Sequence, residues 1–502
     1  MQIEPPATAF ARRYARGEPQ IVWTTLVSDL ETPVSAFLKI AGGRAMSFLL
    51  ESVEGGEARG RYSIIGLDPD VVWRMSHGRA EILRRSEQAG FQPCQEAPLA
   101  ALRAVIAESR IEIPDPLPPM AAGMFGYLGY DMVREMEELP SPNPDPIGIP
   151  DAMLMRPTVV VVFDTIADSM TIVTPVRPEA GIRAEAAFER AGRRLAAIVE
   201  ALDAPLAHWP PRARAGSLTV WPSSNTTAAE YERTVEIAKE YIAAGDIFQV
   251  VLSQRFQAPF ELPPFALYRA LRRINPAPFL YFLDFGSFAV AGSSPEILVR
   301  VREGTVTIRP LAGTRPRGST AHEDRALEEA LLADPKERAE HLMLLDLGRN
   351  DVGRVSRTAT VTVTEQFLVE RFSQVMHIVS NVEGKLDASK DALDAMVAGF
   401  PAGTVSGAPK VRAMEIIDEL EKEKRGLYAG SVGYFSAAGE LDSCIILRTA
   451  LIKDGIMYVQ AGAGIVADSN PKSEQQECVD KAKALFRAAE EAKRFAGLPQ
   501  RE

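Results

Sequence analysis

Two pairs of glutamates stand in segments that share one local pattern. Glu337 and Glu340 follow Asp334 and Pro335, and Glu474 and Glu477 follow Asn470 and Pro471. Aspartate or asparagine before proline is typical of a helix N-cap and first helical position, and a spacing of three places both glutamates on one face. Two such faces turned toward each other would offer oxygen ligands to one cation, which suits Mg²⁺. The alternative is a solvated acidic stripe on each helix, because this spacing is common.

Zinc is not expected at either pair. His341 follows Glu340, but no second histidine stands at metalloprotease spacing, and the chain has only five histidines. The three cysteines, Cys94, Cys444 and Cys478, form no CxxC pair. Their wide separation suits a reducing cytosol and argues against a disulfide framework or a structural zinc site.

Arg448 is a candidate for holding an anion. It lies in the apolar run CIILRTALI (444–452), and an arginine in a buried strand needs an anionic partner. A substrate carboxylate would serve, and so would an internal aspartate or glutamate.

Two glycine-rich stretches and one histidine are less specific. The stretch FPAGTVSGAPK (400–410) enters a helix, whose N-terminal end favours anions, but it lacks the GK[ST] ending of a Walker loop. The stretch 462–467 formally matches GxGxxA, yet loop-forming residues follow it. A dinucleotide site is therefore rejected, and only close backbone approach to a ligand is retained. His377 stands among apolar residues, where a hydrogen-bonded core histidine is the commoner case.

The overall composition bounds the class of protein. The 502 residues are 46% hydrophobic and 25% charged, and 56 basic against 67 acidic residues give a formal charge of −11. Such a chain forms two ordinary domains or one very large one and presents no general surface for nucleic acid or an acidic membrane. No apolar run is long enough to span a membrane, and the N-terminus has no apolar signal-peptide core. We therefore expect a cytoplasmic protein.

Short strand-like runs joined by tight turns position these residues. Residues 61–75 and 156–175 read as strands, the second as a hairpin that turns at Ala167-Asp168. A helix is expected from about Thr227, and strands follow it at intervals as far as residue 460. The βαβ rhythm of a doubly wound sheet is missing, so antiparallel pairing is expected. The looser segment 205–218 indicates a domain boundary, which we place between residues 215 and 216.

Taken together, several stretches resemble the chorismate-utilising enzymes, and among these most closely the large subunits of anthranilate synthases. The matching stretches are GSSPEILVR (292–300), RPLAGTRPRG (309–318), ERAEHLMLLDLGRNDVGRV (337–355), FPAGTVSGAPK (400–410), YAGSVGYF (428–435), ILRTA (446–450) and AGAGIVADSNPKSEQQE (461–477). The stretch LLESVEGGEARGRYSIIG (49–66) extends the resemblance into the first half. The resemblance implies an α+β fold in which large antiparallel β-sheets pack as a sandwich with helices outside, and a catalytic domain over residues 216–502.

The resemblance also implies a reaction and a set of site residues. The family condenses chorismate with ammonia and then eliminates pyruvate. Glu340 and Glu477 would bind Mg²⁺, with Glu337 and Glu474 in supporting positions. The substrate contacts would come from Gly313, Thr314, Tyr428, Arg448, Gly462, Ala463, Gly464 and Lys481. Glu296 matches the general acid for the leaving hydroxyl, which requires a raised pKa, and His377 and Thr404 match residues that assist there.

Two positions separate members of the family. Aminodeoxychorismate synthases usually carry a lysine nucleophile where this chain has Ala312, and isochorismate and salicylate synthases use a lysine where it has Gln249. A chain without the first amine cannot form the covalent adduct, so free ammonia is the expected nucleophile. No cysteine stands in the G-x-C-x-G turn of a glutamine amidotransferase. A separate amidotransferase subunit is therefore expected, in a hetero-oligomer.

Residues 1–215 are interpreted as a regulatory region. The residues matching the family's tryptophan-binding site are Glu51 and Ser52, then Pro278, Phe279 and Leu280, with Val432 and Tyr434 completing the pocket. Phe279 and Leu280 replace the family's usual aromatic residue and methionine but keep an apolar wall. An aminodeoxychorismate synthase component, or a non-catalytic amino-acid sensor, are the alternative functions.

Overall fold

The computed structural model describes residues 1–54, 58–86, 90–206, 222–372 and 375–496. The first half contains α1 (Ala7–Ala15), β1 (Gln20–Val27), α2 (Pro33–Ile40), β2 (Ser47–Glu54), β3 (Ala58–Ser76), β4 (Arg79–Arg84), β5 (Gln92–Pro93), α3 (Pro98–Glu108), η1 (Pro119–Ala121), β6 (Gly123–Leu128), η2 (Tyr130–Glu135), β7 (Ala152–Asp164), β8 (Ser169–Val176) and α4 (Ala184–Asp203). The expected hairpin is present as β7 and β8, and Asp168 in its turn has a φ of +45°.

The second half carries most of the predicted site. It contains β9 (Ser223–Ser224), α5 (Ala228–Ala244), β10 (Gln249–Pro259), α6 (Pro264–Ile274), β11 (Phe279–Asp284), β12 (Ala289–Ser294), β13 (Ile297–Arg302), β14 (Thr305–Ile308), β15 (Leu311–Pro316), α7 (Ala321–Ala333), α8 (Pro335–Gly353), β16 (Thr362–Arg371), β17 (Val375–Lys385), α9 (Ala392–Gly399), η3 (Gly403–Val405), β18 (Gly407–Ala408), α10 (Lys410–Leu420), β19 (Ser431–Ser436), β20 (Leu441–Ile445), β21 (Thr449–Lys453), β22 (Ile456–Ile465), α11 (Pro471–Glu491) and η4 (Ala492–Arg494).

All strand pairs between these elements are antiparallel, and they join into one continuous 22-stranded network. The network crosses between the two halves of the chain, because β2 pairs with β11 and β6 pairs with β19. The predicted α+β fold with antiparallel sheets is confirmed. The division into residues 1–215 and 216–502 stays a prediction, and its boundary lies outside the described residues.

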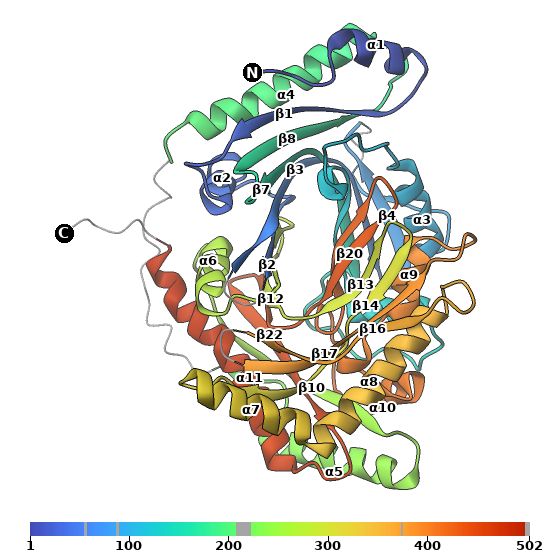
Figure 1. Ribbon diagram of the computed structural model, residues 1–502, viewed down its shortest axis with the longest axis vertical. Coiled ribbons are helices and arrows are strands. Elements are labelled where there is room, and N and C mark those ends of the chain that lie inside the picture. The colour runs from blue at the N-terminus through green and yellow to red at the C-terminus, as the bar shows by residue number, and fades with distance from the viewer. Residues whose placement is uncertain (55–57, 87–89, 207–221, 373–374, 497–502) are drawn as a thin grey trace, which may run out of the picture.

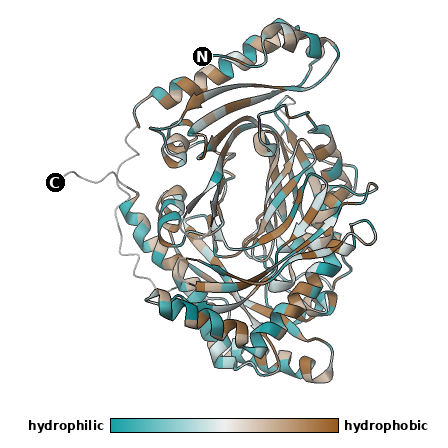
Figure 2. Cartoon of the chain, in the orientation of Figure 1, coloured by the Kyte–Doolittle hydropathy of each residue, from teal (hydrophilic) through white to brown (hydrophobic). Residues whose placement is uncertain are grey.

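Helices cover the outer faces of the sheets (Figure 1). The helix α4 lies over β1 and β8, α11 packs on β22, and α8 packs on β15 and β17. Figure 2 shows the reason: the helices carry hydrophilic residues outward, whereas hydrophobic residues concentrate in the strands and on the inner helix faces. This is the arrangement expected when amphipathic helices bury one stripe against a sheet. Among the described residues, no helix is long and apolar enough to cross a membrane.

The two predicted glutamate-bearing helices begin where the sequence indicates. The Asp334 side chain accepts hydrogen bonds from the backbone N–H groups of Lys336 and Glu337 at the start of α8. The Asn470 side chain does the same for Lys472 and Ser473 at the start of α11. A side chain that caps the free N–H groups fixes the first turn, so these two residues set the position of each glutamate pair.

Candidate active site

The strand register brings most of the predicted site residues together. Thr314 on β15 lies opposite His377 on β17, and Gly462 and Gly464 on β22 lie opposite Ser253 and Val251 on β10. The helix α8 crosses β15 and β17, and α11 packs on β22. The helix α8 therefore brings its glutamate pair to the strands of Thr314 and His377, and α11 brings the other pair to the strand of the glycines.

Glu296 lies in the turn between β12 and β13 and is 6% exposed. Its backbone carbonyl accepts a hydrogen bond of 3.0 Å from Ile445 N. Burial raises the pKa of its carboxyl group to about 8, although Thr404 and the backbone of Leu311 offset part of that effect. A carboxyl group with this pKa is largely protonated at neutral pH and can act as a general acid.

His377 is neutral, and its tautomer follows from its contacts. Its Nδ1 lies 3.0 Å from the carbonyl oxygen of Gly313 and 3.0 Å from Thr314 Oγ1. A carbonyl oxygen only accepts, so Nδ1 carries the hydrogen and Nε2 keeps its lone pair. Burial lowers the pKa of the ring to about 4, with further lowering from the positive charges of Arg448 and Lys481. The buried Nε2 has no hydrogen-bond partner among the described residues, so it can accept a hydrogen bond from a ligand.

Gly313 is needed for this arrangement. It sits at a bulge in the β15–β17 pairing with a φ of +71°, a conformation that favours glycine. A Cβ atom here would stand 3.1 Å from Glu337 Oε2. The bulge therefore turns the carbonyl group of Gly313 toward His377, while β15 still packs against α8.

The carboxylates of α8 and α11 influence one another. Burial raises the pKa of Glu340, and the nearby charges of Glu337 and Glu477 raise it further. The pKa of Glu474 is likewise raised by burial, with a contribution from Glu477. Gln249 donates a hydrogen bond of 3.3 Å to Glu340 Oε1. Glu340 is thus only partly exposed and lies near two other carboxylates, whereas Glu477 on α11 is exposed, so the metal site stays a prediction.

The four carboxylates are not all free. Glu337 forms an ion pair of 2.7 Å with Arg315, and Glu477 forms one of 2.7 Å with Lys481. Lys481 also donates to the carbonyl oxygen of Gly462 at 2.9 Å. In the part of the chain that the structure describes, no three histidine, cysteine, aspartate or glutamate side chains form a ready metal-binding group.

Arg448 stands apart from the other arginines of the site. Burial lowers the pKa of its guanidinium, and no carboxylate of the described residues opposes that effect. Its backbone has a φ of +48°, which non-glycine residues rarely adopt and which is frequent at functional sites. The sequence left open an internal aspartate or glutamate as the partner of Arg448, and the described residues contain no such partner. The charge of Arg448 acts on His377 instead.

The backbone of Gly462–Gly464 is closely approached from both sides. A Cβ atom at Gly462 would stand 2.6 Å from Tyr428 Oη and 2.7 Å from the carbonyl oxygen of Leu252, and one at Gly464 would stand 2.5 Å from Gln249 Nε2. The buried side chains of Tyr428 and Gln249 thus occupy the space that larger residues would need. Within the protein, these two side chains make the close approach to this backbone, and the predicted approach of a ligand stays a prediction.

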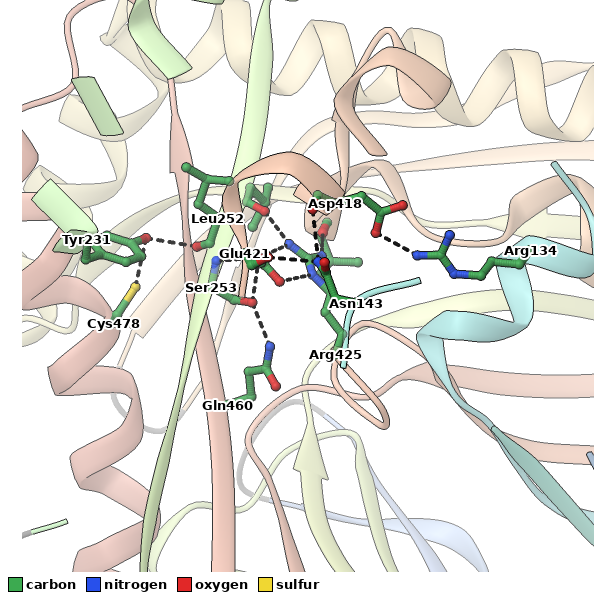
Figure 3. A network of polar contacts seen from close by, with 12 residues as sticks. Arg134, Asn143, Tyr231, Leu252, Ser253, Asp418, Glu421, Arg425, Gln460 and Cys478 are labelled. Atoms are coloured by element: carbon green, nitrogen blue, oxygen red, sulfur yellow. Dashed lines mark hydrogen bonds and ion pairs between the residues drawn. The ribbon is translucent and has the colours of Figure 1, made fainter. Parts of the chain in front are cut away.

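A buried ion pair holds these segments in register (Figure 3). Arg425 donates to Glu421 at 2.6 Å, to the carbonyl oxygen of Val251 at 2.6 Å and to that of Val405 at 2.8 Å. Glu421 accepts from Ser253 N at 2.8 Å and Ser253 Oγ at 2.9 Å. Val405 follows Thr404, and Ser253 lies opposite Gly462, so one guanidinium links two parts of the site.

The comparisons with known proteins agree with this geometry. The family model described as chorismate binding enzyme matches residues 47–487. The chain belongs to the chorismate binding enzyme family. It is 57% identical to the anthranilate synthase component 1 of Cereibacter sphaeroides over 97% of this chain and 98% of that one. It is 50% identical to the component 1 of Pseudomonas putida over 92% and 93% of the two chains. Within the family it groups with these component 1 sequences.

Solved structures show the same fold. The crystal structure of anthranilate synthase component I from Streptococcus pneumoniae matches with a TM-score of 0.74 and 39% identity, over 92% of this chain and 99% of that one. A menaquinone-specific isochorismate synthase from Escherichia coli matches with a TM-score of 0.70 and 21% identity, over 96% and 98% of the two chains. The second match shows the fold alone.

The residues predicted for an inhibitor site lie around a cavity of about 890 Å³, which Glu296 also lines. On its wall, β2 pairs with β11 so that Glu51 lies opposite Leu280 and Ser52 opposite Phe279. The remaining predicted residues, Pro278, Val432 and Tyr434, also line it. Two motifs far apart in the sequence thus meet on neighbouring strands.

Glu51 is not free within that wall. Its carboxylate accepts hydrogen bonds of 2.6 and 2.9 Å from the guanidinium of Arg272 and another from the Tyr268 hydroxyl. The Ser52 hydroxyl donates to the carbonyl oxygen of Tyr62 at 3.1 Å. Both polar side chains therefore brace the wall, and apolar residues form much of the cavity surface beside them.

The sequence did not single out several residues that shape the active site. Arg425, Glu421 and Ser253 carry the buried network, and Gln249 appeared only as the position of a missing lysine. Arg425 itself gave no signal for this role, because it ends the charged run EKEKR (421–425), which is typical of a solvated segment. Its partner four residues earlier, Glu421, reads equally well as an ordinary helix-surface pair.

Proposed function

We propose that the chain is the chorismate-converting component of an anthranilate synthase, which forms anthranilate and pyruvate from chorismate and ammonia. The observation that carries the proposal is the half-buried Arg448, which has no carboxylate partner among the described residues and whose charge acts on His377. A site with an unpaired cation at one end and clustered carboxylates at the other suits a substrate that carries two carboxylates.

The chain's own residues divide into a clamp and a proton donor. Arg448, Tyr428 and the backbone of Gly462–Gly464 would hold one substrate carboxylate, with Lys481, Gly313 and Thr314 nearby. Glu296 would give its proton to the ring hydroxyl, which leaves as water when ammonia adds. The lone pair on His377 Nε2 would accept a hydrogen bond from that hydroxyl, and Thr404 would assist at the same place. The ring C–O bond to the enolpyruvyl group then breaks and a ring proton is lost, which leaves the aromatic amine. The released enolpyruvate takes up one proton and becomes pyruvate.

A magnesium ion fits the chemistry of the acidic residues. The donors are oxygen atoms only, which Mg²⁺ prefers, and the half-buried Glu340 lies near the charges of Glu337 and Glu477, which raise its pKa. Glu340 and Glu477 would hold the ion, and Glu337 and Glu474 would support it. When bound, the ion would neutralise the substrate's ring carboxylate and stabilise charge that develops on the ring. The reaction would be that of a carbon–oxygen lyase.

Ammonia would come from a separate glutamine amidotransferase subunit. The thiols of this chain are unsuited to the work, because burial raises the pKa of Cys478 to about 12 and also raises the pKa values of Cys94 and Cys444. A nucleophilic cysteine needs the opposite shift. Three free cysteines suit a reducing compartment, and we place the complex in the cytoplasm.

Residues 1–215 would form the regulatory part and residues 216–502 the catalytic part. Tryptophan would inhibit the enzyme by binding in the cavity of about 890 Å³, against Glu51, Ser52, Pro278, Phe279 and Leu280 on one wall and Val432 and Tyr434 on the other. The apolar side chains would contact the indole ring.

A direct assay tests the proposed reaction. The purified chain, incubated with chorismate, Mg²⁺ and ammonium at alkaline pH, should produce anthranilate fluorescence and an equal amount of pyruvate. An aminated product that keeps the pyruvyl group would indicate an aminodeoxychorismate synthase instead. No product and no pyruvate would contradict any catalytic role and favour an amino-acid sensor.

The metal assignment makes a separate prediction for Glu340→Gln. The amide keeps the size of the side chain but removes the negative charge, so Mg²⁺ should no longer saturate the enzyme and kcat/KM should fall by about 10²-fold or more. Titration of activity against Mg²⁺ concentration measures this. The matched control is Asp346→Asn on the same helix, an exposed residue that pairs with Arg349 at 2.9 Å. Wild-type Mg²⁺ dependence in the Glu340 variant would exclude this ligand.

A further inference from the structure

A small cavity of about 30 Å³ lies between Glu296 and the helix α8. Three polar residues line it, namely Glu296, Thr404 and Asp351, and apolar side chains such as Leu344, Leu347 and Pro310 close the rest. Asp351 belongs to the RND motif near the end of α8, and neither the sequence nor the proposed reaction has given it a role.

Two polar atoms at this cavity lack partners. Asp351 is 4% exposed, and its Oδ1 and the Thr404 Oγ1 are buried without a hydrogen-bond partner among the described residues. Buried oxygen atoms of this kind are usually satisfied by an internal water, which needs two to four polar partners and about the volume present here. Glu296, Thr404 and Asp351 together supply those partners.

The other oxygen of Asp351 is tied to a cation. Its Oδ2 accepts from Lys410 Nζ at 2.8 Å, an ion pair whose members are both largely buried. Arg354 also acts on Asp351, and burial raises the pKa of its carboxyl group. Asp351 thus lies between a proton-carrying ammonium group on one side and the cavity on the other.

Glu296 needs a proton source of this kind. Under the proposed function it gives one proton to the leaving hydroxyl in each turnover and must recover it before the next. We propose that Asp351 and Lys410 return this proton through a water held in the small cavity, a role that rests on the proposed function of Glu296. Lys410 would give a proton to Asp351, and Asp351 would pass a proton to the water. The water would give one of its own protons to the Glu296 carboxylate. Lys410 would then regain its proton from solvent, so no charge accumulates.

One competing route is open to Glu296. It also lines the cavity of about 890 Å³, from which solvent could protonate it directly. The two routes differ in their dependence on Asp351, because only the first passes through that carboxylate. They also differ in their response to added small acids, which can replace a missing relay group.

The test compares Asp351→Asn with the wild type in the full chain with chorismate, ammonium and Mg²⁺. We expect kcat to fall roughly tenfold while KM stays nearly constant, because proton return rather than binding is slowed. The solvent deuterium isotope effect on kcat should increase, and added imidazole or formate should restore part of the rate. A merely structural role would show neither the isotope effect nor the rescue.

Two further variants keep the test decisive. Asp346→Asn on the same helix is the control and should behave as the wild type. Asp351→Asn alone leaves Lys410 buried without its partner, which destabilises proteins. The double variant Asp351→Asn with Lys410→Met removes both charges. It should show the same low kcat, which added imidazole or formate again raises. Wild-type kcat and isotope effect in a folded Asp351 variant would overturn the relay and favour the larger cavity. Absence of anthranilate from the wild type itself would instead overturn the proposed function.

Discussion

At the scale of single residues, burial does most of the chemical tuning. It raises the pKa of Glu296 to about 8 and lowers that of His377 to about 4, so an acid and a neutral acceptor coexist at neutral pH. It also leaves Arg448 charged without a protein carboxylate beside it among the described residues. Pairs of groups with opposite shifts indicate acid and base roles. Removing these residues from water costs free energy. It also leaves their charges and polar atoms available to a charged substrate.

The raised pKa of Glu296 predicts how activity depends on pH. The protonated form is the acid, so kcat should fall as the pH rises through about 8. Glu296→Gln should lower kcat by about 10²-fold or more and abolish this limb of the pH profile. Stability should follow the same sign. The folded state binds this proton more tightly than the unfolded chain, in which the glutamate has its ordinary pKa of 4.5, so stability is lost as the pH rises from that value to about 8.

Steady-state kinetics and thermal unfolding, each measured across this pH range, check both parts of that prediction. Glu303→Gln is a suitable control, because Glu303 lies on the exposed turn after β13. A Glu296 variant that keeps the wild-type pH profile would show that another group supplies the proton.

At the scale of elements, Arg425 joins segments that the sequence keeps far apart. It bonds the strand β10 at Val251 and the η3 turn at Val405, and its guanidinium lies 5.5 Å from the ring centre of Tyr428. The buried ion pair of Arg425 with Glu421 therefore lies next to the segments that carry Gly462, Thr404 and Tyr428. Such pairs give little net stability when complete but are costly to break.

Variants of Arg425 should separate these effects. Arg425→Met leaves Glu421 buried and unpaired, which should cost about 3–5 kcal/mol of stability. Arg425→Lys keeps the charge but cannot reach Glu421 and both carbonyl oxygens together. We therefore expect a small drop in melting temperature and a larger loss of kcat. Thermal unfolding and steady-state kinetics measure both. Arg412→Lys on α10 is the control, since its pairs with Asp246 and Glu415 are exposed and worth at most about 1 kcal/mol. Equal effects of the two lysine variants would exclude this positioning role.

Local signals predicted these elements better than they predicted their partners. The capping residues Asp334 and Asn470 and the hairpin turn at Asp168 depend on near neighbours, and each was readable from the chain. The bulge at Gly313 and the contact between His377 and its carbonyl depend on strand register between distant segments, which side-chain alternation alone does not determine. The resemblance to a family, rather than any local pattern, assigned those residues to one site.

At the scale of the whole molecule, the continuous sheet connects the proposed regulatory cavity to the proposed active site. The strand β2 from the first half pairs with β11 from the second, and Glu296 lines the same cavity as Ser52 and Phe279. A ligand in this cavity would therefore share it with the turn that carries the proposed general acid. Inhibition could act through Glu296 without any long chain of intermediate residues.

Glu51→Gln tests whether this cavity holds the inhibitor. The amide keeps the shape of the wall but loses the charge that Arg272 on α6 binds at 2.6 and 2.9 Å. Loss of one charged hydrogen bond between this carboxylate and the inhibitor would cost about 1.5–3 kcal/mol. The tryptophan concentration for half inhibition should therefore rise roughly tenfold or more, a larger factor than any change in kcat/KM for chorismate. Inhibition curves at fixed chorismate measure this. The control is Glu18→Gln, an exposed partner of Arg16, which should leave the curve unmoved. Unchanged inhibition in the Glu51 variant would place the inhibitor elsewhere.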